Sequence, residues 1–518
     1  MYTKIDNIKY RDKYIERGNE FGFSEEQILE LIGDTDNPEY IDKYIERRKE
    51  LGIEGIAIDL IVRIKDPQYV DKYIGKREEF GFNNKALVYL ILGTSNTEYI
   101  NKCIERREEL GFNKEDILDL IIGTENPEFI DKCIQNREEF GLEKSDVMKI
   151  AIDNEKYIRE ITKQEGVQTD LPANMTIGIE IETVGKESKW LKDRKTIGGW
   201  KCKGDGSLKS KNSNETGVEV ISPILAGNIV ITEEVRKTCT ILENLDQYTN
   251  ETCGGHIHIG ANYLTNVQAW KNLLELWANT EQALYIVSNE EGEIPRLGVP
   301  YYASPISGDL EELLGSGSIN LEDETDLEKF QEKLVRTQED RYKGINFKNL
   351  AQGGKGTIEF RLPNGAVDAN TWIENINLFG GIVKSAQDLS VIQAKNISER
   401  TEQEQHLLEC FEKIRNKELD EKETFEQLLE IVVPEKSRNS YRKRYETNSE
   451  LLKQNPIIER GIRTKTAKGS VKISKNRIGK EIFTGEDRIT GEENQQTEEV
   501  LSEEMKKMIS FLRDISIE

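Results

Sequence analysis

The first 160 residues of the chain repeat one pattern at intervals of 29 or 30 residues. Each copy contains a glycine between two apolar residues, as in FGF, LGI or FGL. These glycines are Gly22, Gly52, Gly81, Gly111 and Gly141. A fixed period of this length is typical of stacked supersecondary units, in which each unit buries its apolar face only against its neighbours. The repeat therefore restricts this part of the chain to an array of similar units.

Two helices are predicted in each copy, an amphipathic one before the glycine and a shorter apolar one after it. YIDKYIERRKEL and EDILDLIIG are examples, with apolar residues at helical spacing. Asn37-Pro38 and Asp66-Pro67 mark helix starts, because the first side chain can cap the helix and proline suits its first turn. We therefore predict five helix–turn–helix repeats, which form a short α-solenoid over residues 1–160.

Three segments that follow the repeats each carry two ionisable side chains separated by one apolar residue. They are Glu180 and Glu182 in TIGIEIET, His256 and His258 in GGHIHIG, and Glu359 and Arg361 in TIEFRLP. Side chains at positions i and i+2 of a strand share one face. A single pair could be an amphipathic edge strand, but three pairs together with Glu219 in GVEVISP indicate a site. Carboxylates suit Mg²⁺ or Mn²⁺, and Mn²⁺ also tolerates imidazole.

Six motifs follow one another over about 190 residues: GIEIE, GDGS, EVISP, CGGHIHIG, RYKGIN and TIEFRLPNG. In this order they resemble the amidoligase branch of the glutamine synthetase-like carboxylate–amine ligases. The resemblance implies an antiparallel sheet that is open on one face and holds ATP and divalent metal ions, Mg²⁺ or Mn²⁺. It also implies a reaction in which ATP activates a carboxylate substrate as an acyl phosphate, which an amine then attacks.

The resemblance assigns roles to individual residues. The implied metal ligands are Glu180, Glu182, Glu219, His256 and Glu359. Arg361 would bind phosphate or the carboxylate substrate, a task that suits its planar fork. His258 would contact the substrate, and Asp205 of the DGS turn would help to place the amine or a metal ion. Arg341 and Asn346 would lie near the phosphates of the nucleotide.

Some of these motifs have plainer explanations. Arg341 and Asn346 are residue types that are common in loops, and a simple Asp-Gly turn would explain Asp205 equally well. Cys253 completes a C-x-x-H-x-H pattern, but soft sulfur is a poor partner for hard carboxylates, so we expect a small buried cysteine. AQGGKGT at 351–357 lacks the spacing of a phosphate-binding loop and precedes a strand, so we expect a hairpin turn.

The predicted fold class is α+β. The predicted order is the helical repeats at 1–160, a polar linker at 161–175, the amidoligase-like catalytic domain at 176–390, a helical extension at 391–455, a charged linker at 456–499 and an amphipathic helix at 500–518. Within the charged linker, residues 461–480 hold seven basic residues and no acidic one. They form either a solvated segment or a docking tail for an acidic partner.

The net charge of −24 argues against general binding to nucleic acid, which requires a basic surface. No signal-peptide core or membrane-spanning apolar run is found, and the six cysteines are scattered without a CxxC pair. We therefore expect a cytoplasmic protein without a membrane anchor. The repeats favour a peptide or protein as substrate or partner, because an enzyme acting on small molecules does not need such a surface.

Two other functions remain open from the sequence. Guanidino kinases resemble the same sheet and would transfer phosphate without ligation, although their phosphate site is rich in arginine, whereas these motifs are rich in carboxylates and carry paired histidines. A decayed ligase could instead serve as a scaffold for protein binding. Decay usually removes ligands, and all the principal polar residues are present. The identity of the carboxylate and the amine stays open.

Overall fold

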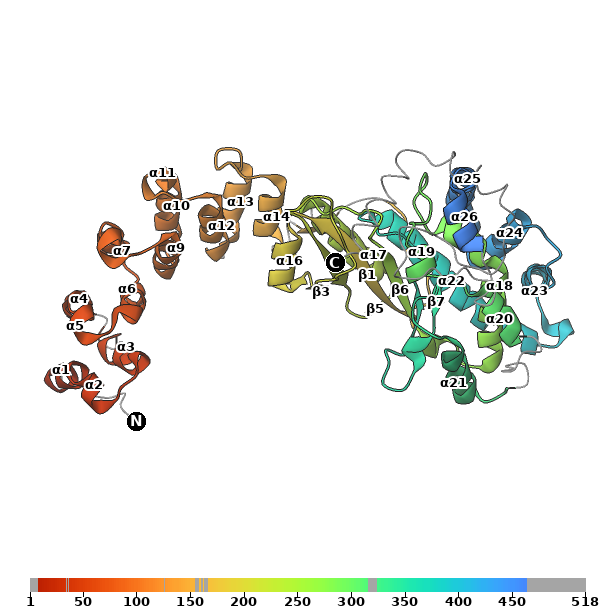
Figure 1. Cartoon of the computed structure of the whole chain (residues 1–518), viewed down its shortest axis with the longest axis horizontal. Coiled ribbons are helices and arrows are strands. Elements are labelled where there is room, and N and C mark those ends of the chain that lie inside the picture. The colour runs from red at the N-terminus through yellow and green to blue at the C-terminus, as the bar shows by residue number, and fades with distance from the viewer. Residues whose placement is uncertain are drawn as a thin grey trace, which may run out of the picture. The chain divides into compact units, whose positions relative to one another are not determined.

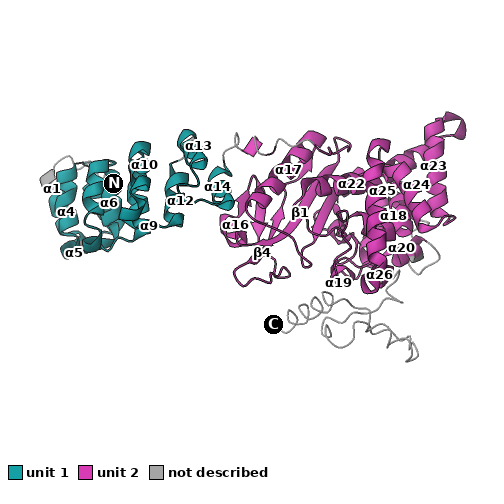
Figure 2. Cartoon of the chain, turned by 90° about the horizontal axis from the view of Figure 1, so that it is seen from above, with its two compact units in different colours: residues 1–157 teal, residues 158–518 magenta. Residues whose placement is uncertain are grey.

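A computed structural model describes residues 8–463, apart from 34, 36, 125, 154–157, 160–161, 163–165 and 315–323. The predicted helix at 500–518 and most of the basic segment 461–480 lie outside these residues. The chain divides into two compact units, residues 1–157 and residues 158–518 (Figure 2). Among the described residues, no helix has the length and apolar character needed to cross a membrane.

The described residues of the first unit form helices joined by short turns (Figure 1). Its helices are α1 (Ile8–Glu16), α2 (Gly18–Phe21), α3 (Glu25–Gly33), α4 (Pro38–Glu46), α5 (Arg48–Leu51), η1 (Glu54–Ile56), α6 (Ala57–Arg63), α7 (Pro67–Ile74), α8 (Arg77–Phe80), α9 (Asn84–Gly93), α10 (Thr97–Glu105), α11 (Arg107–Leu110), α12 (Lys114–Gly123), α13 (Pro127–Gln135) and α14 (Lys144–Ala151). Helices α3, α6, α9 and α12 pack against one another in succession.

The helix ends follow the sequence signals. The Asn37 side chain accepts the N–H groups of Glu39 and Tyr40 at the start of α4. Gly52 ends α5 in the left-handed conformation, with φ of 68°. The prediction of one continuous helix before this glycine is wrong, because Arg47 between α4 and α5 leaves the helical conformation, with φ −94° and ψ 9°.

An aspartate in one repeat binds tyrosines of the next. Asp42 accepts hydrogen bonds from the hydroxyls of Tyr69, at 2.8 Å, and Tyr73, and it also pairs with Lys72. Asp12 makes the same contacts one repeat earlier, with Tyr40, Tyr44 and Lys43. These polar contacts supplement a continuous apolar core that runs from Ile15 to Ile150 within this unit.

The second unit contains one antiparallel sheet in the order β2-β3-β4-β1-β6-β8-β7, with β5 paired to the start of β1. Its strands are β1 (Thr176–Gly185), β2 (Thr196–Ile197), β3 (Trp200–Lys203), β4 (Thr216–Ile221), β5 (Leu225–Ala226), β6 (Gly255–Gly260), β7 (Ile345–Asn346) and β8 (Thr357–Phe360). A mixed helix and antiparallel sheet architecture was predicted, and at that level the prediction is confirmed.

Along the chain, helices lie between the strands of this unit and follow the last strand. They are α16 (Ser188–Arg194), α17 (Asn228–Asn244), η2 (Ala261–Tyr263), α18 (Val267–Val287), α19 (Val299–Tyr302), α20 (Ser307–Leu314), α21 (Leu327–Thr337), η3 (Lys348–Leu350), α22 (Ala369–Ala394), η4 (Ile397–Glu399), α23 (Glu402–Arg415), α24 (Glu421–Val432), η5 (Glu435–Ser437), α25 (Arg438–Lys453) and α26 (Pro456–Arg463). The C-terminal helical region thus continues beyond the predicted boundary at 455, to Arg463.

Helices cover the apolar face of the sheet. Ile181, Ile257 and Phe360 are fully buried on this face. The ring of Phe360 stacks on Phe379 of α22, with ring centroids 4.7 Å apart, and lies 5.5 Å from Trp277 of α18. Since side chains alternate along a strand, this packing turns the ionisable residues of the same strands to the opposite face.

Residues 166–175 belong to the second unit and contact its helices instead of extending into solvent. The Thr169 hydroxyl donates to the carbonyl of Asn228 at 2.8 Å, and the N–H of Asp170 donates to Asn377 Oδ1 at 2.8 Å. The predicted polar linker at 161–175 is therefore bound, over this stretch, to helices α17 and α22.

Candidate functional site

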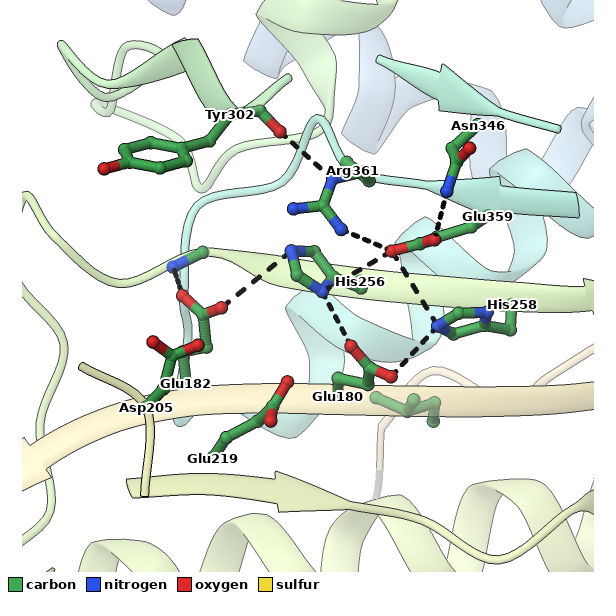
Figure 3. A network of polar contacts seen from close by, with 12 residues as sticks. Glu180, Glu182, Asp205, Glu219, His256, His258, Tyr302, Asn346, Glu359 and Arg361 are labelled. Carbon is green, nitrogen blue, oxygen red and sulfur yellow. Dashed lines mark hydrogen bonds and ion pairs between the residues drawn. The ribbon is translucent and has the colours of Figure 1, made fainter. Parts of the chain in front are cut away.

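Strand pairing brings the ionisable residues onto one face of the sheet. Glu182 on β1 lies opposite Glu219 on β4, and Glu180 lies opposite His256 on β6. On the next strand pair, His258 lies opposite Glu359 on β8. All of these side chains converge in the view of Figure 3, and all are buried.

His256 occupies the middle of the cluster. Its Nδ1 lies 2.8 Å from Glu180 Oε2 and 3.7 Å from Glu359 Oε1. Its Nε2 lies 3.9 Å from Glu182 Oε1 (Figure 3). One imidazole therefore links carboxylates from two different strands, β1 and β8.

His258 lies on the other side of Glu180. Its Nε2 is 3.2 Å from Glu180 Oε1, without the geometry of a hydrogen bond, and its Nδ1 is 3.1 Å from the hydroxyl of Thr357. The hydroxyl of Thr357 can satisfy one ring nitrogen, which leaves the other facing the carboxylates. Both paired histidines thus point into the site, and neither packs into the apolar core.

Glu182 and Glu219 form the second part of the cluster. Glu182 Oε2 accepts the backbone N–H of Gly254 at 2.6 Å. Glu219 Oε2 pairs with Nζ of Lys203, on β3, at 2.7 Å. A Cβ atom on Gly254 would lie 2.3 Å from the buried guanidinium of Arg296. A side chain at this position would displace the Arg296 guanidinium, which donates to the carbonyl of Pro363 at 2.7 Å.

Arg361 and Asn346 both bind Glu359. Nη1 of Arg361 lies 2.5 Å from Glu359 Oε1, and its Nε donates to the carbonyl of Tyr302 at 3.0 Å. Asn346 Nδ2 donates to Glu359 Oε2 at 2.6 Å (Figure 3). The asparagine that was predicted to lie near the nucleotide phosphates is thus fully buried and orients a carboxylate.

Two predicted residues lie at the margin of the cluster. Asp205 forms a tight turn in which its Oδ1 accepts both the N–H and the hydroxyl of Ser207 at 2.7 Å. Arg341 is exposed, and its guanidinium lies 5.3 Å from the ring centre of Tyr342. The structure does not bring Arg341 into the buried cluster.

The carboxylates differ in their electrostatic environment. Burial raises the pKa of Glu359, but the charges of His256 and Arg361 outweigh this effect and lower the pKa to about 2. Burial also opposes ionisation of Glu180, but its contacts with His256 and His258 hold its pKa well below the usual range. Burial raises the pKa of Glu219 although Lys203 counteracts it. Glu180 and Glu359 are therefore ionised at neutral pH.

Two overlapping groups of residues fit a divalent cation. Glu180, His256 and Glu359 form one group and Glu182, Glu219 and His256 form the other, each with ligand atoms within 4.8 Å of one another. Oxygen donors with an occasional imidazole suit Mg²⁺ or Mn²⁺. The five predicted metal ligands are the members of these two groups, and the structure brings them together.

Cys253 fits the expectation of a structural cysteine. It is fully buried, and burial raises the pKa of its thiol to about 12. A thiol that is neutral at physiological pH is a weak nucleophile and a poor metal ligand. The candidate metal ligands of the site are therefore oxygen and nitrogen atoms, not the Cys253 sulfur.

Among the described residues, three whose side chains contact carboxylates of the cluster were not predicted as site residues. They are Lys203, Lys355 and Asn349. Lys203 lies in WKCK, whose alternation could have placed it on the polar face of a strand. Asn349 lies in the three-residue helix η3 and Lys355 in the turn that follows it. Both segments are too short for a periodic pattern to predict where their side chains point.

The fold and the site define a protein of mixed helices and antiparallel sheet with a buried candidate centre for divalent cations. Residues 159–383, which include every strand of the sheet, match the model of a family described as "putative amidoligase enzyme". This part of the chain belongs to the amidoligase family, as its motifs indicated, and the family points to ligase activity. A search of curated proteins finds no match to the chain.

Proposed function

We propose that the chain is an ATP-dependent ligase that joins a carboxylate to an amine through an acyl phosphate, with Mg²⁺ or Mn²⁺. The observation that carries this proposal is the convergence of four carboxylates and two histidines on one face of the sheet, next to Arg361. Such a site can hold the phosphates of a nucleotide against bound cations while keeping apolar surface away from them.

The proposed ligands are Glu180, Glu182, Glu219, His256 and Glu359. A bound divalent cation supplies charge neutralisation for the phosphates and for the group in transfer. Arg361 is held on one side by Glu359 and on the other by the Tyr302 carbonyl. Its guanidinium is thereby positioned for the phosphate or the carboxylate substrate, and it can stabilise negative charge as that charge develops.

His258 and Asp205 are the proposed contacts for the substrates. His258 faces Glu180 from the neighbouring strand, and Asp205 lies on the turn that follows β3. Arg341, exposed beside Tyr342, is proposed to contact the nucleotide from the rim of the site. The sheet is proposed to be of the glutamine synthetase-like type.

The N-terminal repeats are proposed to form an α-solenoid that binds a peptide or protein, either as substrate or as partner. The successive packing of α3, α6, α9 and α12 and the recurring aspartate–tyrosine contacts support this arrangement. Consumption of ATP agrees with the expected location in the cytoplasm.

The test is incubation of the full chain with ATP, Mg²⁺ and pools of amino acids or peptides, followed by mass spectrometry. A ligase yields ADP and a product that weighs the sum of two substrates less one water. Glu359→Gln, which keeps the size of the side chain, should abolish both. A phosphorylated guanidino product would instead identify a kinase, and the absence of ADP with every pool would favour a binding scaffold.

A further inference from the structure

Lys355 reaches from the protein surface into the buried site. Its side chain is 59% exposed, yet its Nζ lies 2.9 Å from Oε1 of Glu180, whose side chain is only 9% exposed. Glu180 belongs to one of the two groups that fit a divalent cation. Lys355 therefore lies at the outer edge of the site, where its ammonium group pairs with a candidate cation ligand.

The turn that carries Lys355 is anchored to the same site. Asn349, just before the turn, donates its Nδ2 to Glu359 Oε2 at 2.9 Å, and its carbonyl accepts the N–H of Gly356 at 2.9 Å. A Cβ atom on Gly354 would lie only 2.4 Å from this carbonyl oxygen, so the tight turn requires glycine there. The backbone thus holds Lys355 over the site, while its flexible four-carbon stem can reorient.

An ammonium group and a divalent cation compete for Glu180. The repulsion between a doubly and a singly charged cation is twice that between two unit charges at the same distance. A cation held by Glu180, His256 and Glu359 therefore favours departure of Lys355. An ammonium group that leaves Glu180 needs another anionic partner. Lysine is a common phosphate-binding residue, so a polyphosphate bound at this cation can be that partner.

We propose that Lys355 competes with the divalent cation for Glu180 and, once displaced, binds the phosphates of the nucleotide. This inference rests on the function proposed above, and it names a nucleotide-binding residue outside the family motifs. The consequence is a coupling between the two ligands, because removing Lys355 strengthens binding of the cation and weakens binding of the nucleotide.

Lys355→Met in the full chain tests this coupling. Mn²⁺ binding without nucleotide, followed by electron paramagnetic resonance, should become about tenfold tighter, a coupling of ordinary size for interacting sites. Binding of the non-hydrolysable analogue AMP-PNP at saturating Mn²⁺, followed by calorimetry, should become about tenfold weaker, as expected for loss of one charged hydrogen bond. Lys355→Arg, which keeps the charge, should stay close to wild type in both measurements.

Lys453→Met is the matched control, because Lys453 is also an exposed lysine paired with a glutamate, Glu450, at 2.6 Å. It should change neither constant. The inference is overturned if Lys355→Met shifts both constants in the same direction or shifts neither, as a purely structural residue would. If the wild-type chain binds neither Mn²⁺ nor AMP-PNP, the proposed function itself fails and the inference falls with it, so the two failures are distinguishable.

Discussion

Both oxygens of Glu359 are held by neighbouring side chains. Its Oε1 pairs with Arg361 at 2.5 Å, and its Oε2 accepts from Asn346 at 2.6 Å and from Asn349 at 2.9 Å. Arg361 is held in turn by the carbonyl of Tyr302. Groups fixed in this way lose little freedom when a ligand binds, which is the preorganisation that electrostatic catalysis requires.

Arg361→Lys is expected to reduce turnover of ATP by about 10²- to 10³-fold, in spite of the conserved charge. The planar fork of arginine can contact Glu359, the Tyr302 carbonyl and a substrate oxygen at once, whereas lysine presents a single point charge. Steady-state release of ADP measures the effect, and Mn²⁺ binding should survive because the carboxylates are unchanged. Turnover within about threefold of wild type, in a variant shown to be folded, would mean that Arg361 is a structural residue.

At the scale of elements, the 21-residue helix α18 carries a carboxyl group that is buried with incomplete pairing. Glu275 Oε2 is buried and has no hydrogen-bond partner among the residues that the structure describes. Burial raises the pKa of Glu275 from 4.5 to about 7, with opposing effects from Arg415 and Glu412 on α23. At this carboxyl group, the folded protein therefore binds more protons than the unfolded chain between pH 4.5 and pH 7. The contribution of Glu275 to the free energy of unfolding falls as the pH rises through this window.

Glu275→Gln removes this titration and is expected to stabilise the protein above pH 7. The gain is at most about 3 kcal/mol at pH 8, from a shift of roughly two pKa units, and is small at pH 5, where wild-type Glu275 is largely protonated when folded. Melting temperatures at the two pH values measure it. Glu409→Gln changes an exposed carboxylate on α23 and serves as the control. An equal change in melting temperature at both pH values would contradict the assignment.

The contacts between repeats form a second feature at this scale. Asp42→Ala is expected to loosen the packing of α4 on α7 by about 1–3 kcal/mol, because the hydroxyls of Tyr69 and Tyr73 lose their shared acceptor. Hydrogen exchange of the full chain, followed by mass spectrometry, should accelerate in both helices and stay unchanged in the sheet. Lys49→Ala, at an exposed position of α5, is the control. Unchanged exchange in α7 would show that these hydrogen bonds contribute nothing to the packing.

At the scale of the whole molecule, the chain consists of two units with separate cores. The core of the first unit, from Ile15 to Ile150, includes no residue of the second. Contacts within it join neighbouring repeats, so its folding does not require distant parts of the chain. The second unit contains the sheet, the candidate site and the described C-terminal helices.

Residues 1–157 expressed alone are expected to fold as a helical unit, which far-UV circular dichroism measures directly. A spectrum of disordered chain or of strands would contradict this expectation. Residues 158–518 should retain binding of Mn²⁺ and AMP-PNP but lose selection of the second substrate, if the repeats bind it. Assays of the same substrate pools with the full chain and with this fragment separate ligand binding by the second unit from substrate selection by the repeats.

Much of the fold was predictable because its signals are local. The caps at Asn37 and Asp66 depend on a few adjacent residues, and both are observed as predicted. The break at Arg47 was missed because the amphipathic pattern continues across it. The segment 166–175 was predicted as a linker from its polarity, yet its polar groups bind α17 and α22, which polarity alone does not reveal.

The sequence by itself determined which residues share a strand face, because alternation within a strand is a local property. Glu180 with Glu182 and Glu359 with Arg361 could therefore be paired from spacing alone. Only the tertiary structure decided which strands are neighbours, since β1 pairs with β6 across an intervening stretch that includes β2 to β5 and α17. The tertiary structure alone also brought Lys355 into contact with Glu180, 175 positions away, and Asn346 into contact with Glu359. Contacts of this kind depend on how the sheet and its loops close in space, which no local pattern encodes.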